Sequence, residues 1–292
     1  MNARLSRLIG LTLIALISLP ALSATRTHGL WVWKGPAILS DERAAQRLVA
    51  FCRDNDINEV YLAISSHGVM MPDDSVIEVI GALHRNLIRV EALLSSDDAD
   101  EAGPHRDKLL REIGDIVQFN RRSPHNRIDG IHLDIEPQQR AENKGSGKLR
   151  FLPGLVETYR AARAQAELVG LTLNADIQNK LLKGTLAERR MLLGALPRLT
   201  LMMYELSAPG EDEAAQVSQV QRASRKFLDM AYADVDGSTS ARMVIGLRSP
   251  DYGDELPVML EALDAANSAD PHFLGWARHS YNDQLDRQRG KE

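Results

Sequence analysis

The chain has 292 residues, a formal net charge of −5 at pH 7 and a sequence pI near 5.9. This acidic balance argues against nucleic acid or an anionic membrane as the main partner, because both attract a basic surface. Hydrophobic residues make up 44% of the chain, which is ordinary for a globular protein, and the length suits one large domain.

The first residues are typical of a secretory signal peptide. Arg4 and Arg7 precede an apolar run from Leu8 to Leu22, and Ala21 to Ala24 offers small residues for cleavage. An uncleaved membrane anchor is the alternative, although Pro20 interrupts the short run. We therefore expect a signal peptide at residues 1–24 and a mature domain at 25–292, periplasmic or secreted, without a stable membrane anchor after cleavage.

From Gly29 onward, short apolar runs alternate with amphipathic stretches, which predicts a parallel sheet with crossover helices. Eight strands are predicted: Gly29–Lys34, Asn58–Ser65, Leu87–Ser95, Asp129–Glu136, Leu171–Asp176, Leu199–Tyr204, Arg242–Arg248 and Phe273–Arg278. Eight such units fit one α/β domain, a single (β/α)8 TIM barrel. After Tyr281 only a polar tail remains, so the final helix should be short or missing.

Cys52 is the only cysteine, so no intramolecular disulfide is possible. It falls among Ala45, Leu48 and Val49 at helical spacing, which predicts a small buried hydrophobe. The eight histidines form no recognisable ligand cluster, so the sequence predicts neither a metal site nor another cofactor.

The segment 129–137 carries the strongest functional signal. It alternates strictly, with Ile131, Leu133 and Ile135 on one side and a histidine and two acids, His132, Asp134 and Glu136, on the other. On a strand this places the three ionisable side chains on one face. Crowded carboxylates raise one another's pKa and can yield a proton donor near neutral pH, so the pattern favours an active site. An edge strand with a wet polar face is the alternative.

This segment resembles the signature strand of chitinase-type enzymes, glycoside hydrolase family eighteen, which reads Asp-Gly-x-Asp-x-Asp-x-Glu on the fourth barrel strand. Asp129, Gly130, Asp134 and Glu136 match, and His132 stands where the family has Asp or Asn. The resemblance implies a carbohydrate-active (β/α)8 barrel.

Further candidates lie at other strand ends, where such barrels place their reacting groups. Met202-Met203-Tyr204-Glu205 resembles the family's Met-x-Tyr-Asp, whose tyrosine contacts an N-acetyl group; the alternative is a buried tyrosine beside an ordinary loop acid. The resemblance also suggests Trp276 as the pocket floor, with core packing as the alternative. Four more residues at strand ends are candidates for substrate binding, Trp33, Asp176, Glu205 and Arg248, and so is His132 within the signature strand.

Strand seven ends without a carboxylate before Asp251, which weakens a retaining scheme with a protein nucleophile. The resemblance implies substrate-assisted catalysis instead: Glu136 protonates the leaving oxygen, Asp134 orients the acetamido nitrogen and Tyr204 holds its carbonyl. We therefore expect an exported hydrolase of β-linked N-acetylated amino-sugar oligosaccharides or polysaccharides.

Two other functions remain open: a lectin-like barrel that binds such sugars with little or no catalysis, and a different chemistry on the same scaffold. The residue at position 132 bears on this choice. A neutral His132 could donate to Asp134, whereas a charged one would lower the pKa of its neighbours. Replacing it by the family's Asp is expected to raise activity or shift its pH optimum.

Overall fold

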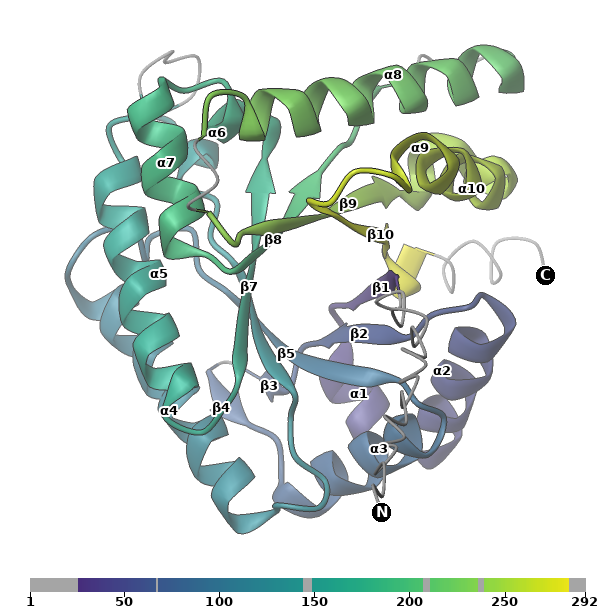
Figure 1. The fold of residues 1–292 in the computed structure, drawn as a ribbon. Coiled ribbons are helices and arrows are strands. Elements are labelled where there is room, and N and C mark those ends of the chain that lie inside the picture. The colour runs from purple at the N-terminus through teal and green to yellow at the C-terminus, as the bar shows by residue number, and fades with distance from the viewer. Residues whose placement is uncertain (1–25, 67, 144–148, 207–210, 236–238, 284–292) are drawn as a thin grey trace, which may run out of the picture.

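The computed structural model describes residues 26–66, 68–143, 149–206, 211–235 and 239–283. Eight parallel strands close into a barrel in the order β1-β10-β9-β8-β7-β6-β5-β2, which confirms the predicted single (β/α)8 barrel (Figure 1). The barrel strands are β1 (Thr27–Val32), β2 (Glu59–Leu62), β5 (Arg89–Ser95), β6 (Gly130–Asp134), β7 (Thr172–Gln178), β8 (Arg198–Met202), β9 (Arg242–Arg248) and β10 (Phe273–His279). The expected signal peptide and the tail beyond residue 283 lie outside the described residues.

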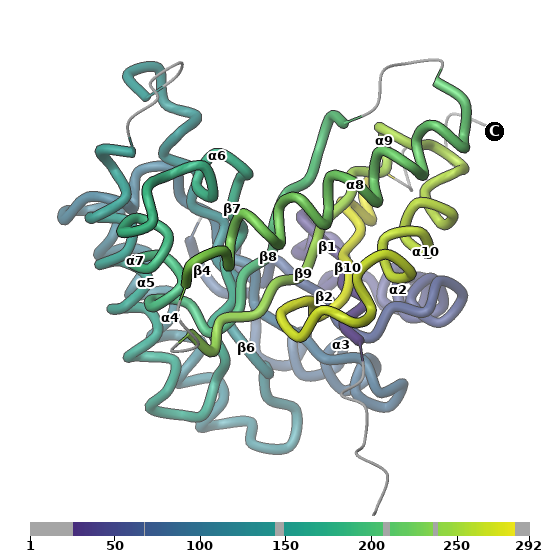
Figure 2. Tube along the Cα trace, turned by 45° about the horizontal axis from the view of Figure 1, so that its top comes forward, coloured from purple at the N-terminus to yellow at the C-terminus, as the bar shows by residue number. Residues whose placement is uncertain are grey.

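Helices surround the strands, as the tube in Figure 2 shows. The α-helices are α1 (Gly35–Leu39), α2 (Glu42–Asp54), α3 (Asp73–Arg85), α4 (Pro104–Arg122), α5 (Leu152–Glu167), α6 (Asn179–Leu182), α7 (Leu186–Ala195), α8 (Glu213–Tyr232), α9 (Ser249–Tyr252) and α10 (Leu256–Asn267). Two 3-10 turns, η1 (Pro137–Gln139) and η2 (Gly253–Glu255), follow β6 and α9. The thiol of Cys52 is buried in α2, as its helical spacing predicts, and burial raises its pKa to about 12.

Strand β2 ends well before its predicted boundary. The run Asn58–Ser65 forms β2 only as far as Leu62, and Ser65 belongs to a separate two-stranded hairpin of β3 (Ser65–Ser66) and β4 (Val69–Met70). The apolar run continues past the barrel because Ile64 is fully buried where the chain turns into this hairpin. Its length in the sequence therefore overstates the strand.

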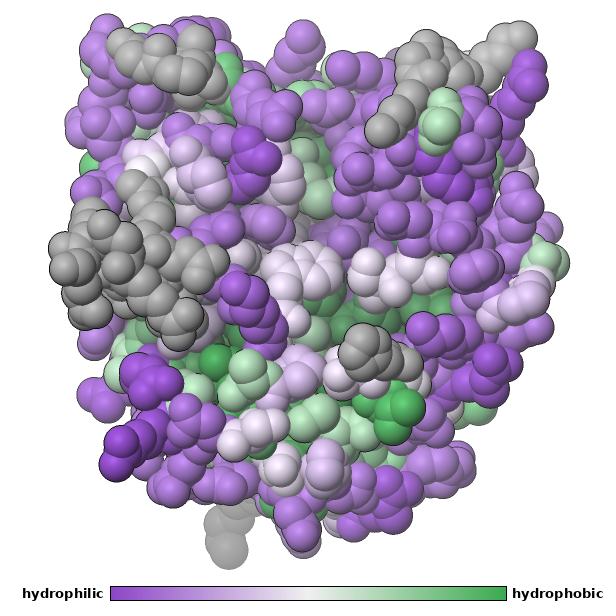
Figure 3. Space-filling view, turned by 180° about the vertical axis from the view of Figure 1, so that it is seen from behind, coloured by the Kyte–Doolittle hydropathy of each residue, from purple (hydrophilic) through white to green (hydrophobic). Residues whose placement is uncertain are grey.

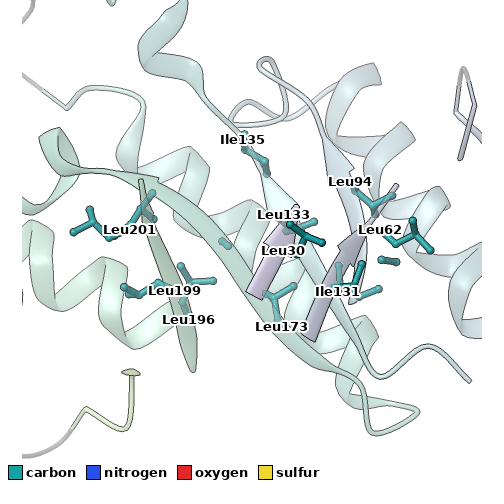
Figure 4. Close-up of a cluster of buried hydrophobic side chains, with 14 of the residues drawn as sticks. Leu30, Leu62, Leu94, Ile131, Leu133, Ile135, Leu173, Leu196, Leu199 and Leu201 are labelled. Atoms are coloured by element: carbon teal, nitrogen blue, oxygen red, sulfur yellow. The ribbon is translucent and has the colours of Figure 1, made fainter. Parts of the chain in front are cut away.

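The main core lies between the outer face of the barrel and the helices. Ile131, Leu133 and Ile135 are fully buried in this layer beside Leu173 of β7 (Figure 4). Side chains on a strand alternate between its two faces, so His132 and Asp134 must face the barrel interior. The structure confirms the predicted orientation of this strand.

The barrel interior is unusually polar. A small apolar group fills part of it: Trp31, Tyr61, Leu93, Val244 and Ala277. The remaining inward positions include fully buried polar side chains, among them Glu91, His132, Asn174 and Thr200. Barrel interiors are usually packed with branched apolar side chains, so this polar column needs an electrostatic explanation.

Hydrophilic side chains cover much of the face shown in Figure 3, with apolar ones between them. The large apolar side chains that are exposed, Val69, Leu87, Leu168 and Val258, come from separate parts of the chain. Within the described ranges, no helix is both long and apolar enough to cross a membrane.

Candidate active site

A pocket of about 430 Å³ opens at the C-terminal end of the barrel strands. Its lining comes from six barrel strands and the segments that follow them: Trp31, Trp33, Asp134, Glu136, Gln139, Asp176, Gln178, Asn179, Met202, Tyr204, Glu205, Arg248 and His279. All the sequence candidates except His132 and Trp276 therefore meet in one place.

Glu136 lies just beyond β6, at the start of the turn η1, and three glutamine amides hold its carboxylate. Gln139 donates to Oε1 at 2.9 Å, Gln138 donates to Oε2 at 3.1 Å, and Gln178 at the end of β7 also donates to Oε2. Burial raises the pKa of Glu136, and these amide bonds oppose that rise because they favour the ionised form. The side chain of Glu136 is thus fixed in orientation, and its pKa lies above the ordinary value for a glutamic acid.

Asp134 is the last residue of β6 and is nine-tenths buried. Its Oδ1 atom has no hydrogen-bond partner among the described residues. Burial raises the pKa of this carboxyl well above its usual range, and the charges of Asp176 and Glu136 raise it further. The surroundings of Asp134 therefore favour the protonated form more than those of an ordinary aspartate do.

Tyr204 stands two residues after β8, on the loop and not within the predicted strand. Its hydroxyl is buried in the pocket and has no partner in the described part of the chain. Burial raises the pKa of this phenol well above its usual value, so the hydroxyl keeps its proton and can donate. The guanidinium of Arg248 lies over the ring at 5.8 Å from its centroid.

The rim beside Tyr204 is held by a charged group of three. Arg248 at the end of β9 contacts Asp251 at 2.6 Å and Glu205 at 3.4 Å. Asp251 also accepts from the Glu205 backbone N–H at 2.9 Å, where Glu205 adopts a φ of +56° that non-glycine residues rarely occupy. Strand β9 therefore brings an arginine into the pocket, and Asp251 holds it in place.

His132 lies beneath the pocket and does not line it. It is fully buried, so the expectation that it contacts substrate is wrong. Its Nδ1 is 3.0 Å from Glu91 of β5, and its Nε2 is 2.8 Å from Asp176 of β7. It reaches across to both neighbouring strands, so the alternative in which it donates to Asp134 is also wrong.

Both ring nitrogens of His132 face carboxylate oxygens, and only the imidazolium has two N–H donors. Burial alone would lower its pKa, but the carboxylates of Asp176 and Glu91 outweigh burial and raise the pKa to about 9. The ring also stacks on Tyr61 with centroids 3.8 Å apart, which suits a cation over an aromatic face. His132 is therefore charged at neutral pH.

Trp276 does not form the pocket floor. It packs in the outer layer and stacks on His28 with centroids 4.1 Å apart, so the core-packing alternative is confirmed. The reason is the alternation along β10, where Ala277 faces the interior and Trp276 therefore faces out.

His279, which the sequence reasoning missed, lines the pocket at the end of the last strand. It accepts a hydrogen bond at Nε2 from the Trp33 indole at 3.0 Å, and its ring lies 5.4 Å from that of Tyr204. Burial lowers its pKa, so it is a neutral acceptor. Because side chains alternate along a strand, an inward Ala277 predicts that His279, two residues later on β10, also faces the interior.

Other residues missed by the sequence reasoning are the amides around Glu136 and the indole of Trp31. Trp31 donates from Nε1 to Oδ2 of Asp176 at 2.9 Å. Gln139 could not have been found by periodicity, because it lies on the turn η1 and not on a strand. Within the described residues, no three His, Cys, Asp or Glu side chains are arranged to hold a metal ion.

No protein-family model matches the chain, and no curated protein sequence matches it. Solved structures do match. The PgaB glycoside hydrolase domain from Bordetella bronchiseptica has a TM-score of 0.56, with 10% identity over 91% of this chain and 97% of that one. A GH18 chitinase from Pseudoalteromonas aurantia has a TM-score of 0.53, with 12% identity over 91% of this chain and 99% of that one.

The C-terminal domain of a protein assigned as a chitinase from Desulfitobacterium hafniense also has a TM-score of 0.53, with 12% identity over 76% of this chain. The chain spans 66% of that structure's length. These identities are too low to carry an activity across, but the shared architecture is clear. The chain is a (β/α)8 barrel whose fold is similar to those of these chitinase and glycoside hydrolase domains.

Proposed function

We propose that this protein hydrolyses β-linked N-acetylated amino-sugar polymers with Glu136 as general acid. One observation carries the proposal: Asp134 Oδ1 and the Tyr204 hydroxyl are buried and have no hydrogen-bond partner within the described ranges, and both residues line the pocket that contains Glu136. Unpaired buried polar atoms are costly unless a ligand satisfies them. An acetamido group offers an N–H for Asp134 and a carbonyl oxygen for Tyr204.

The chemistry follows from this placement. Glu136 gives its proton to the glycosidic oxygen while the acetamido oxygen attacks the anomeric carbon, and the bond to the leaving sugar breaks. The ring formed on the sugar is then opened by water, whose proton returns to Glu136. Tyr204 and Asp134 hold the acetamido group in line for attack, which lowers the entropic part of the barrier.

The fold comparisons support this proposal by analogy only. The structural neighbours are named as chitinases and a glycoside hydrolase domain, so a polysaccharide is the substrate class we carry over. We further propose that the protein is exported after cleavage near Ala24 or Thr25. Sequencing the N-terminus of protein recovered outside the cytoplasm tests this, and an intact Met1 there would contradict it.

The direct test compares wild type with Glu136→Gln on β-linked N-acetylglucosamine oligomers. General acid catalysis contributes a factor of roughly 10² to 10⁴, so turnover should fall by that factor. Oligomer binding, measured by calorimetry, should remain close to wild type because the amide keeps the side chain's shape.

Glu142→Gln is the matched control, since Glu142 is exposed and pairs only with Arg140 in the described contacts. It should leave turnover unchanged. Equal losses in both variants would contradict the assignment of Glu136.

A lectin-like barrel is the second candidate, and one observation favours it. Both oxygens of Glu136 already accept amide hydrogen bonds, as in a binding site that holds a fixed acceptor. Wild-type protein that binds the oligomers with no cleavage would establish this function. Protein that neither binds nor cleaves acetamido sugars would contradict both.

A further inference from the structure

The carboxylate of Asp176 is fixed at both of its oxygens. Oδ1 lies 2.8 Å from Nε2 of the buried imidazole of His132, and Oδ2 accepts from the Trp31 indole at 2.9 Å. The side chain is 99% buried, yet it lines the pocket. Few arrangements hold a carboxylate so firmly next to a reacting group, and Asp176 cannot rotate away without losing both donors.

Asp176 faces an acidic neighbourhood. The charged groups that act on Asp134 come from three elements: Asp176 on β7, His132 and Glu136 on or after β6, and Asp97 on the loop after β5. Asp176 also acts on Glu136, together with Asp97. Arg248 of β9 and the neutral His279 of β10 are the other titratable groups from the last two strands that line the pocket.

We propose that Asp176, locked by the His132 imidazolium, is a positioning residue that decides which of the two acids, Asp134 or Glu136, holds the proton. This inference rests on the proposed function for its consequence in catalysis. Asp176 lies on the strand next to that of Asp134 and lines the same pocket, so its carboxylate disfavours a second anion at Asp134, and the contacts with His132 and Trp31 hold that carboxylate in place. When an acetamido group binds Asp134, the charge on Asp176 sets how readily that proton is shared with Glu136.

The ion pair also changes the expectation for position 132. An aspartate there would place three carboxylates together, those of Glu91, Asp176 and the new residue, without the imidazolium between them. Uncompensated buried charge is strongly destabilising. His132→Asp should therefore reduce soluble folded protein and activity, the opposite of what the family pattern alone predicts.

Carboxyl titration by ¹³C NMR tests the proposal without any substrate. Spectra of wild type, Asp176→Asn, His132→Asn and His132→Asn/Asp176→Asn are recorded from pH 3 to pH 10. In Asp176→Asn the pKa of Asp134 should fall, and the pKa of His132 should drop from about 9 toward 6.5. An unchanged Asp134 titration, or a His132 that is already neutral at pH 7 in wild type, would overturn the proposal.

The double variant keeps the net charge of the site and guards against misfolding. Asp176 raises the pKa of Asp134 and the His132 cation lowers it, so the effect of Asp176 is isolated by comparing the double variant with His132→Asn alone, and the Asp134 pKa should be lower in the double variant. Equal Asp134 titrations in these two variants would overturn the proposal even if Asp176→Asn fails to fold.

A second experiment measures kcat/KM as a function of pH for wild type and Asp176→Asn. In Asp176→Asn its alkaline limb should move to lower pH, whereas a merely structural role would lower the rate equally at every pH. Glu205→Gln removes an acid that is exposed on the same rim, and it should leave the position of that limb unchanged whatever it does to the rate. Absence of cleavage in wild type would count against the proposed function, and the NMR result would still decide the role of Asp176.

Discussion

Glu136 and its two partners are supported in opposite ways. Three glutamine amides orient Glu136, whereas Asp134 and Tyr204 each present a buried polar atom that no described residue satisfies. A general acid needs a fixed direction toward the glycosidic oxygen, so its support belongs to the protein. In the proposed function, the groups that hold an acetamido moiety need free hydrogen-bonding capacity, which Asp134 Oδ1 and the Tyr204 hydroxyl retain toward the described residues.

Tyr204→Phe separates catalysis from folding. Removing a hydroxyl that has no partner should leave the free energy of unfolding within about 1 kcal/mol of wild type. Turnover should fall by roughly 10-fold to 10³-fold, because a donor to the attacking group is lost. Urea denaturation and steady-state kinetics measure the two effects.

Tyr232→Phe is the matched control. Its hydroxyl also lacks a described partner, but the ring stacks on His272 far from the pocket lining. It should change neither stability nor turnover. A Tyr204→Phe variant as active as Tyr232→Phe would remove the hydroxyl from the proposed site.

At this scale the sequence predicts what one strand determines by itself. The alternation of Ile131 to Glu136 is enough to place Asp134 and Glu136 on the pocket side. The role of His132 could not be predicted, because its two partners come from strands 41 residues before it and 44 residues after it. A salt bridge across strands depends on register, which periodicity does not give.

At the scale of the elements, a glycine on β9 makes room for the Trp31 ring inside the barrel. Gly246 faces the barrel interior, and a Cβ there would lie 2.6 Å from Cη2 of Trp31. The same indole donates to Asp176, so the missing side chain on β9 helps to place a hydrogen bond at β7. Strands opposite each other in the barrel are thus coupled through one aromatic ring.

Gly246→Ala should push Trp31 out of position. Overpacking of this kind costs roughly 1–3 kcal/mol of unfolding free energy, and turnover should fall further than stability suggests because Asp176 loses a donor. Thermal unfolding and kcat/KM give the two values.

Gly114→Ala in α4 is the control, because a Cβ there meets nothing within 4 Å. A helical glycine replaced by alanine should stabilise by about 0.5–1 kcal/mol and leave turnover unchanged. If Gly246→Ala behaves like this control, Trp31 is not held by the close contact.

The order and type of the elements were predictable because apolar runs and amphipathic stretches alternate clearly. All eight barrel strands fall where their runs predict, but only β9 has the predicted bounds at both ends. Tyr204 was predicted inside a strand that ends at Met202, and the floor was assigned to Trp276 and not to His279. The β10 register shifts between Phe273 and Gly275, and such an irregularity has no signal in hydrophobicity.

Across the whole molecule, charge runs through the barrel interior from one end to the other. Arg198 near the N-terminal end contacts Glu59 at 2.8 Å and Glu91 at 3.3 Å, and Glu91 in turn contacts His132. Burial would raise the pKa of Glu91, but Arg198 and His132 lower it to about 2. Alternating signs let a polar column replace the usual apolar filling.

This column makes stability depend on pH in a defined direction. The folded pKa of His132 is about 9 against 6.5 in the unfolded chain, so its stabilisation is complete below pH 6.5 and is lost as pH rises through 9. The free energy of unfolding should therefore fall by about 3 kcal/mol between pH 6.5 and 9, as urea titrations at fixed pH can measure.

His132→Asn provides the comparison, because it lacks the titrating group. Its unfolding free energy is expected to be lower at pH 6.5 and nearly flat up to pH 9. A wild-type curve parallel to that of this variant would show that His132 is not charged in the folded protein.

The most direct measurement of the proposed activity is ¹H NMR of fresh products from a β-linked N-acetylglucosamine oligomer. Substrate-assisted attack by the acetamido oxygen, with Glu136 as acid, retains configuration, so the β-anomer of the new reducing end should appear first and the α-anomer only later by mutarotation. Products that form first as the α-anomer, or an oligomer that stays intact, would contradict the account.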